Sequence, residues 1–212
     1  MTDEGVVEIL TVAGHKLREL YLGSTNITGQ NWHHLLSFDL LQRENGNGNV
    51  STKEEEESTC KTDGLSHLLH LDLDSCGLTD EGVVQVVRSC GGQLKELMLD
   101  WTTISGESWQ TLPTNSLPNL HKLSMHGCSR LSDQGVVEVL NRCGDHLQQV
   151  NLRQTRITGE SWALIRPLHH VNKLQLTTCK LLTHQGVREI LNKCDPTKTE
   201  FSVKNLKVGS SF

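Results

Sequence analysis

The hydrophobic positions of the chain follow a short pattern that recurs seven times. Each copy places apolar residues as apolar-x-x-apolar-x-apolar, and only the last copy is degraded. The copies are Leu17/Leu20/Leu22, Leu68/Leu71/Leu73, Leu94/Leu97/Leu99, Leu120/Leu123/Met125, Leu147/Val150/Leu152, Val171/Leu174/Leu176 and Lys198/Phe201/Val203. Because alternate residues of a strand point to opposite sides, the pattern predicts seven short strands, each with one buried side.

Two kinds of unit, each about 24 to 27 residues long, alternate between these strands. One kind carries a Gly-Val block that opens a stretch of helical spacing, and the other carries Ile, a hydroxyl residue, Gly and then Trp. The first blocks are Thr2–Val7, Thr79–Val84, Ser132–Val137 and Thr183–Val187, and the second are Thr25–Trp32, Thr103–Trp109 and Thr155–Trp162. We expect Thr79, Ser132 and Thr183 to cap helices.

A strand of this pattern followed by a helical segment, at this period, is the signature of leucine-rich repeats. The sequence therefore predicts an α/β solenoid with a curved parallel sheet of about seven strands on its concave face and helices on its convex face. We expect one domain over residues 1–212, with residues 195–212 forming the last strand and a cap.

Cysteines recur in the helical units. They stand directly after a strand at Cys76, Cys128 and Cys179, and near the helix end at Cys90, Cys143 and Cys194. These motifs resemble the cysteine-containing leucine-rich repeats of F-box proteins and of the antagonist-of-mitotic-exit family, over nearly the whole chain except residues 42–64. The chain departs from that family in its alternate units, where Thr25, Thr102 and Thr155 replace Cys. The resemblance implies a binding scaffold.

The recurring Cys, Trp and Gly residues have structural interpretations. We expect the six cysteines and Trp32, Trp109 and Trp162 to be buried, and the repeated glycines to permit close approach of a helix or a tight turn. A zinc site using Cys128 with His121 or His126 is the alternative, but paired ligands at zinc spacing are lacking. We therefore expect no metal and no cofactor.

Residues 42–64 interrupt the repeats. They hold three basic and six acidic residues without apolar periodicity, which predicts an acidic, disordered insertion. A regulatory role for Ser51, Thr52 or Cys60 and a decayed repeat are the alternatives. The chain also begins in mid-repeat, since no strand precedes Thr2–Val7. Either it derives from a longer protein, or the first helix is itself the cap.

The overall charge narrows the classes of partner. Twenty basic and 25 acidic residues give a net charge of −5, which disfavours nucleic acid and anionic membranes. No apolar run is long enough to span a bilayer, and no signal sequence opens the chain. With seven cysteines and no disulfide pattern, we expect a cytoplasmic or nuclear protein.

Residues between the paired apolar positions should point out of the concave face. The first outward column is Tyr21, Asp72, Met98, Ser124, Asn151, Gln175 and Ser202, and the next is Gly23, Asp74, Asp100, His126, Arg153, Thr177 and Lys204. Trp101 follows the second column where other units carry small or polar residues, which is typical of an interface hot spot. Local packing onto Met98 or a loop is the alternative. The candidate partner-binding residues are Tyr21, Asp72, Asp74, Met98, Asp100, Trp101, His126, Asn151 and Arg153.

These features favour a non-catalytic scaffold that binds a protein or peptide on its concave face. The family resemblance implies substrate recognition in a ubiquitin ligase or cell-cycle regulation. A ligand-sensing or autoinhibitory region of a NOD-like immune receptor is the alternative, and a hydrolase using an exposed cysteine such as Cys60 is a third. The sequence contains no recurring pair of nucleophile and base that would suggest an enzyme. A catalytic triad whose members meet only in the folded protein would, however, leave no pattern in the sequence. The oligomeric state stays open.

Overall fold

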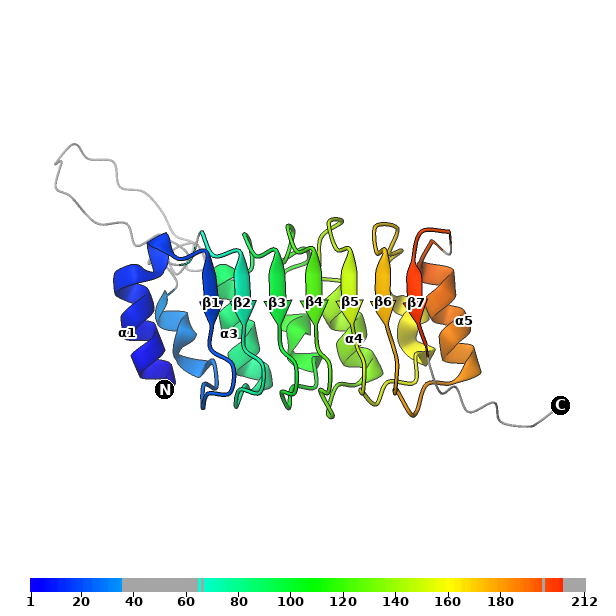
Figure 1. The fold of residues 1–212 in the computed structure, drawn as a ribbon, viewed down its shortest axis with the longest axis horizontal. Coiled ribbons are helices and arrows are strands. Elements are labelled where there is room, and N and C mark those ends of the chain that lie inside the picture. The colour runs from blue at the N-terminus through cyan, green and yellow to red at the C-terminus, as the bar shows by residue number, and fades with distance from the viewer. Residues whose placement is uncertain (36–64, 66, 196, 204–212) are drawn as a thin grey trace, which may run out of the picture.

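The computed structural model describes residues 1–35, 65, 67–195 and 197–203. Seven three-residue strands form one parallel sheet in chain order (Figure 1). They are β1 (Glu19–Tyr21), β2 (His70–Asp72), β3 (Glu96–Met98), β4 (Lys122–Ser124), β5 (Gln149–Asn151), β6 (Lys173–Gln175) and β7 (Glu200–Ser202). The predicted α/β solenoid is confirmed. The insertion at residues 42–64, Cys60 and residues 204–212 of the expected cap lie outside the described residues.

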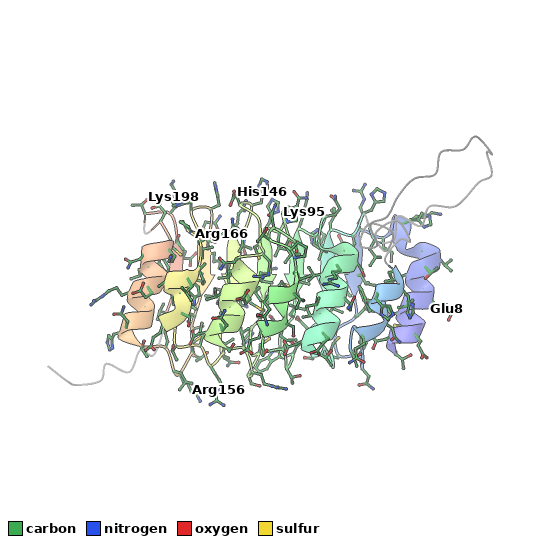
Figure 2. The ribbon with its side chains drawn as sticks, turned by 180° about the vertical axis from the view of Figure 1, so that it is seen from behind. Glu8, Lys95, His146, Arg156, Arg166 and Lys198 are labelled. Atoms are coloured by element: carbon green, nitrogen blue, oxygen red, sulfur yellow. The ribbon has the colours of Figure 1, made fainter. Side chains whose placement is uncertain are left out.

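Helices cover one side of this sheet, and two kinds of helix alternate there (Figures 1 and 2). The α-helices are α1 (Asp3–Ala13), α3 (Asp80–Cys90), α4 (Asp133–Leu140) and α5 (His184–Lys193). The 3₁₀ helices are η1 (Gly14–Lys16), η2 (Gln30–Leu35), η3 (Glu107–Thr111) and η4 (Glu160–Leu164). The opposite side of the sheet carries no helix in the described part of the chain, and we call it the open face.

The core lies between the sheet and the helices. The central strand residues pair across the sheet in the register that the sequence predicted, and they are Leu20, Leu71, Leu97, Leu123, Val150, Leu174 and Phe201. Trp32, Trp109 and Trp162 are fully buried, which confirms them as core residues. Their indole N–H groups find no partner in the described chain, so the rings contribute through apolar area.

Each cysteine after a strand joins its unit to the preceding one. The carbonyl oxygen of Leu99 accepts hydrogen bonds from the Thr102 hydroxyl at 2.7 Å and the Cys128 thiol at 3.1 Å. The same arrangement recurs at Leu22/Thr25/Cys76 and Leu152/Thr155/Cys179. The Thr-for-Cys alternation therefore supplies two complementary donors to one carbonyl.

The six cysteine side chains within the described residues are buried and unpaired with one another. Burial raises the pKa of the Cys128 thiol to about 11 and that of Cys143 to about 12. Both thiols therefore stay protonated at neutral pH. No cluster of three or more potential metal ligands occurs among the described residues.

The turns before the 3₁₀ helices η2, η3 and η4 are each held by both neighbouring α-helices. The Asp80 carboxylate on α3 accepts hydrogen bonds from the backbone N–H of Ser105 at 2.8 Å and of Gly106 at 3.0 Å. On the other side, Gly135 of α4 approaches so closely that a Cβ there would lie 1.9 Å from the Ser105 carbonyl oxygen. The repeated Gly therefore permits a close approach of the helix to the preceding turn, rather than to a strand.

The same double contact occurs at the two other turns of this kind. Thr28–Gly29 lies between Asp3 and Gly82, and Thr158–Gly159 lies between Asp133 and Gly186. Each turn belongs to a 3₁₀ unit and needs an α-helical unit on both sides, so the structural repeat is the pair of units. We call this arrangement the turn clamp.

Helix α1 differs from the other α-helices because the described chain places no turn against its Gly5. Only Thr2 Oγ1, at 3.9 Å, comes near a Cβ built there. Ile9 and Val12 are 49% and 74% exposed, whereas Val86, at the place of Ile9 in α3, is buried. Thr2 also makes no cap hydrogen bond, although the expected caps at Thr79, Ser132 and Thr183 all do. Helix α1 thus leaves exposed the side that its counterparts bury.

The turn clamp predicts opposite results for two chemically identical substitutions. Gly135→Ala forces a methyl group against the Ser105 carbonyl and should lower the free energy of unfolding by about 2 kcal/mol. Gly5→Ala adds a methyl group to open space within a helix and should be neutral or stabilising by up to about 1 kcal/mol. Urea unfolding followed by circular dichroism measures both. Equal effects would contradict the clamp.

Candidate protein-binding surface

Three columns of side chains cross the open face, one more than the sequence analysis identified. The two predicted columns lie in the expected register, except that Lys204 is outside the described residues. The additional column precedes them along each strand and contains Glu19, His70, Glu96, Lys122, Gln149, Lys173 and Glu200. Strand alternation places these residues outward too, because each directly precedes a central residue that lies in the core or packs against it.

The first outward column, which begins with Tyr21, is exposed at β1, and its residues become more buried toward the middle of the sheet. Tyr21 is 67% exposed and donates its hydroxyl to Glu19 at 2.9 Å. Met98 and Asn151 are half-buried, while Ser124 between them is buried. The Asn151 amide donates to Ser124 Oγ at 3.0 Å. Tyr21 and Met98 are therefore the accessible apolar groups of this column.

The acidic residues near the ends of β2 and β3 accept hydrogen bonds from backbone N–H groups, Asp72 from its own unit and Asp74 and Asp100 from the next unit. The Asp72 carboxylate accepts from the Asp74 N–H at 2.9 Å, and Asp74 accepts from the Asp100 N–H at 2.8 Å. Asp100 in turn accepts from the His126 N–H at 2.8 Å and from the Ser124 hydroxyl. These bonds form a carboxylate ladder across β2 to β4.

The placement of Asp100 corrects the expectation that it faces a partner. Its side chain is buried, because the ladder draws the carboxylate down onto Ser124 and the next backbone. Asp74 is half-buried, and desolvation, followed by the charges of Asp100 and Asp72, raises its pKa to about 6 against the opposing hydrogen bond from Asp100. The carboxylates of Asp74 and Asp100 therefore serve as hydrogen-bond acceptors within the fold.

Trp101 occupies a backbone conformation that large residues rarely adopt. Its φ is +60°, and every described residue at this turn position also has positive φ: Ser24, Ser75, Gly127, Gln154 and Thr178. Left-handed backbone is unfavourable for a bulky side chain, whereas small and polar residues tolerate it better. The register therefore forces this conformation on whichever residue follows the second column.

The Trp101 ring packs partly onto the neighbouring unit and partly faces solvent. It covers Gly127, where a Cβ would lie 2.4 Å from the ring, and its centroid is 4.8 Å from that of His126. His126 Nε2 shares a hydrogen bond with Gln154 Oε1 at 2.9 Å. The residue is still 54% exposed. It packs on a turn, as the alternative interpretation expected, and also presents half of its surface.

Charge on the open face changes from acidic over β1 to β3 to basic over β4 to β6, and Glu200 on β7 is acidic again. Over β1 to β3 the side chains include Glu19, Asp72 and Glu96, and beyond them lie Lys122, Arg153 and Lys173. The acidic and basic parts meet at Glu96, which lies 3.4 Å from Lys122 and 3.6 Å from His70. Arg153 is exposed, and its backbone N–H donates to Asn151 at 3.2 Å. An approaching chain therefore meets opposite charges on the two sides of Trp101.

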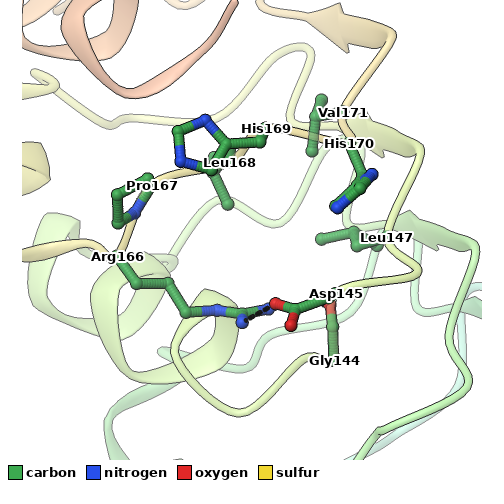
Figure 3. A pocket seen from close by; sticks show the side chains of 9 residues that line it. All are labelled: Gly144, Asp145, Leu147, Arg166, Pro167, Leu168, His169, His170 and Val171. Carbon is green, nitrogen blue, oxygen red and sulfur yellow. Dashed lines mark hydrogen bonds and ion pairs between the residues drawn. The ribbon is translucent and has the colours of Figure 1, made fainter.

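A small hollow near the start of β6 has a structural explanation (Figure 3). Its volume is about 10 Å³, room for about one water molecule. The Arg166 guanidinium reaches Asp145 at 2.5 Å and the Gly144 carbonyl at 2.7 Å, and it also donates to the Cys143 carbonyl. These bonds satisfy carbonyl groups between two units, so the hollow offers no space for a ligand.

Comparison with known protein families identifies one segment of the chain. Residues 64–86 match the family model described as Leucine Rich repeat. The matched segment includes β2 and the first part of α3, one strand-and-helix unit of the sheet. Together with the seven-stranded parallel sheet, the match supports a leucine-rich repeat protein. Among the helices described, none has the length and apolar character needed to span a membrane.

The raised pKa of Asp74 predicts a pH-dependent gain from Asp74→Asn. A carboxyl whose pKa rises on folding binds its proton more tightly when folded, so the wild type loses stability as the pH rises from about 4 to 6. Asn keeps an oxygen for the Asp100 N–H without the charge. Measured by unfolding, the stability of Asp74→Asn relative to the wild type should rise by about 1 kcal/mol over this pH range. This figure is reduced from the full effect of the pKa shift because the carboxylate is partly exposed.

The control for this prediction is Glu8→Gln, which removes an exposed carboxylate of α1 (Figure 2). Its stability difference from the wild type should stay nearly constant between pH 4 and pH 7. An equally flat profile for Asp74→Asn would show that the half-buried carboxylate carries no cost.

Proposed function

We propose that this protein is a non-catalytic scaffold that binds a protein or peptide partner on the open face of its sheet, centred on Trp101. The leucine-rich repeat match is what suggests a protein–protein interaction scaffold. We assign the binding surface to the open face, because its outward columns run across all seven strands of the sheet. We place the protein in the cytoplasm or nucleus, where its buried free thiols suit a reducing environment.

The observation that carries this proposal is the exposed Trp101 at a left-handed position. A bulky residue held in such backbone typically costs about 1 to 3 kcal/mol. The other described units carry Ser, Gly, Gln or Thr there, so the repeat itself does not require an aromatic side chain. Half-exposed Trp in a polar surface is characteristic of an interface hot spot.

The finer role follows from the cysteine motifs. Their resemblance to repeats of F-box proteins and the antagonist-of-mitotic-exit family favours substrate recognition in a ubiquitin ligase or cell-cycle regulation. The hydrogen bonds of Cys76, Cys128 and Cys179 to the preceding unit explain why such motifs recur without any catalytic use of the thiols.

Quantitative affinity capture with the tagged full chain tests the proposal. Trp101→Ala should reduce capture of a specific protein at least tenfold, because loss of a hot spot costs about 2 kcal/mol or more. Leu164→Ala is the matched control, since Leu164 is a large apolar residue of η4 with 66% exposure on the helical side. It should capture the same protein as the wild type.

Circular dichroism separates binding from folding in this experiment. Trp101→Gly removes the same ring and relieves the left-handed backbone, so it should unfold no earlier than Trp101→Ala. If both Trp101 variants are folded and still capture every protein that the wild type captures, Trp101 is not a binding residue and the proposal fails.

A further inference from the structure

A hollow in the open face lies over β1 to β4. Its volume is about 190 Å³. The residues that line it are Tyr21, His70, Leu71, Asp72, Glu96, Met98 and Lys122. They come from four consecutive strands and include an aromatic ring, a thioether, two carboxylates and the basic groups of His70 and Lys122. Such a mixture can hold a side chain that is apolar along its length and charged at its end.

Negative charge at this hollow exceeds the positive charge that balances it. In the described chain, neither Glu19 nor Asp72 has a basic group within 4.0 Å, and Glu96 alone is shared by His70 and Lys122. The Tyr21 hydroxyl is affected by the same negative charges. Its pKa is raised by the hydrogen bond and charge of Glu19, and further by the charges of Glu96 and Asp72.

The apolar groups are placed to receive the stem of a basic side chain. Tyr21 is 67% exposed and lies across from Asp72 and next to Glu19, while Met98 is the following residue of the same column. A guanidinium group stacks favourably on an aromatic ring, and its methylene stem packs on apolar atoms. Arg suits this site better than Lys, because its planar group can bind carboxylates and the ring at once.

We infer that the hollow between Tyr21 and Met98 receives an arginine or lysine side chain of an extended partner segment, with its charged end held by Glu19 and Asp72. This inference rests on the proposed function, since it names the chemistry of the partner on the same face. The basic part of the face, with Arg153 and Lys173, repels a uniformly basic chain. The partner is therefore basic where it crosses β1 to β3 and not throughout.

The test selects peptides without assuming the partner. A phage-displayed library of random 12-residue peptides is panned on the full chain, and the enriched sequences are counted. The same library is panned on Glu19→Gln/Asp72→Asn, whose amides keep the oxygen acceptors for Tyr21 and for the Asp74 backbone. The charge-matched control is Glu4→Gln/Glu8→Gln, which removes two exposed carboxylates from α1 instead. Trp101→Ala is panned in parallel.

The expected result is enrichment of Arg or Lys on the wild type and on the α1 control, and its loss on Glu19→Gln/Asp72→Asn. Enriched peptides without a basic residue, or basic peptides equally enriched on Glu19→Gln/Asp72→Asn, overturn the inference. Whether the peptides are lost on Trp101→Ala decides the proposed function separately. A library that yields no enriched peptide counts against both.

A synthetic peptide from the selection then gives the strength of the contact. Replacing its arginine by citrulline keeps the shape and removes the charge. This replacement should weaken binding to the wild type about tenfold or more, the lower end of the coupling measured for close charge pairs, and should have little effect on Glu19→Gln/Asp72→Asn. An equal loss on both proteins shows that the arginine binds elsewhere and overturns the inference.

Discussion

The turn clamp is the contact on which the rest of this structure depends. At each of three turns, an Asp carboxylate on one helix binds two backbone N–H groups, and a Gly on the next helix lies against a turn carbonyl. A carboxylate that accepts backbone N–H bonds makes strong, charge-assisted contacts. A side chain at the Gly position would push the units apart. The clamp therefore fixes the spacing of the units and explains why an α-helical unit must alternate with a 3₁₀ unit.

Fixed spacing determines what the open face can offer. Once the strands lie in register, Asp74 and Asp100 of the second column accept hydrogen bonds from backbone N–H groups of the next unit, and Asp72 of the first column accepts one from its own unit. The residue after that column must adopt a left-handed conformation in every described unit. Side chains that these demands do not explain, above all Trp101 and Tyr21, are the ones left for binding.

The sequence predicts the strands, their register and the buried residues because alternation within a strand and repetition between units are both visible in a single chain. The same reasoning finds the structural role of Cys128 and its counterparts. It places Asp100 wrongly, because alternation gives the side of the sheet but not the hydrogen bonds that bury a side chain. The clamping role of Asp80 was missed although it lies in a repeated block, since its partners stand 25 and 26 residues later. The Glu19 column was accessible to the alternation argument and was overlooked.

Site-specific photo-crosslinking measures most directly which side of the solenoid binds. Benzoylphenylalanine is placed in cells at Met98, on the open face, or at Leu164, on the helical side. The account predicts that position 98 crosslinks to a discrete protein and that position 164 does not. A discrete crosslink from position 164 with none from position 98 would place the interaction on the helices and contradict the account.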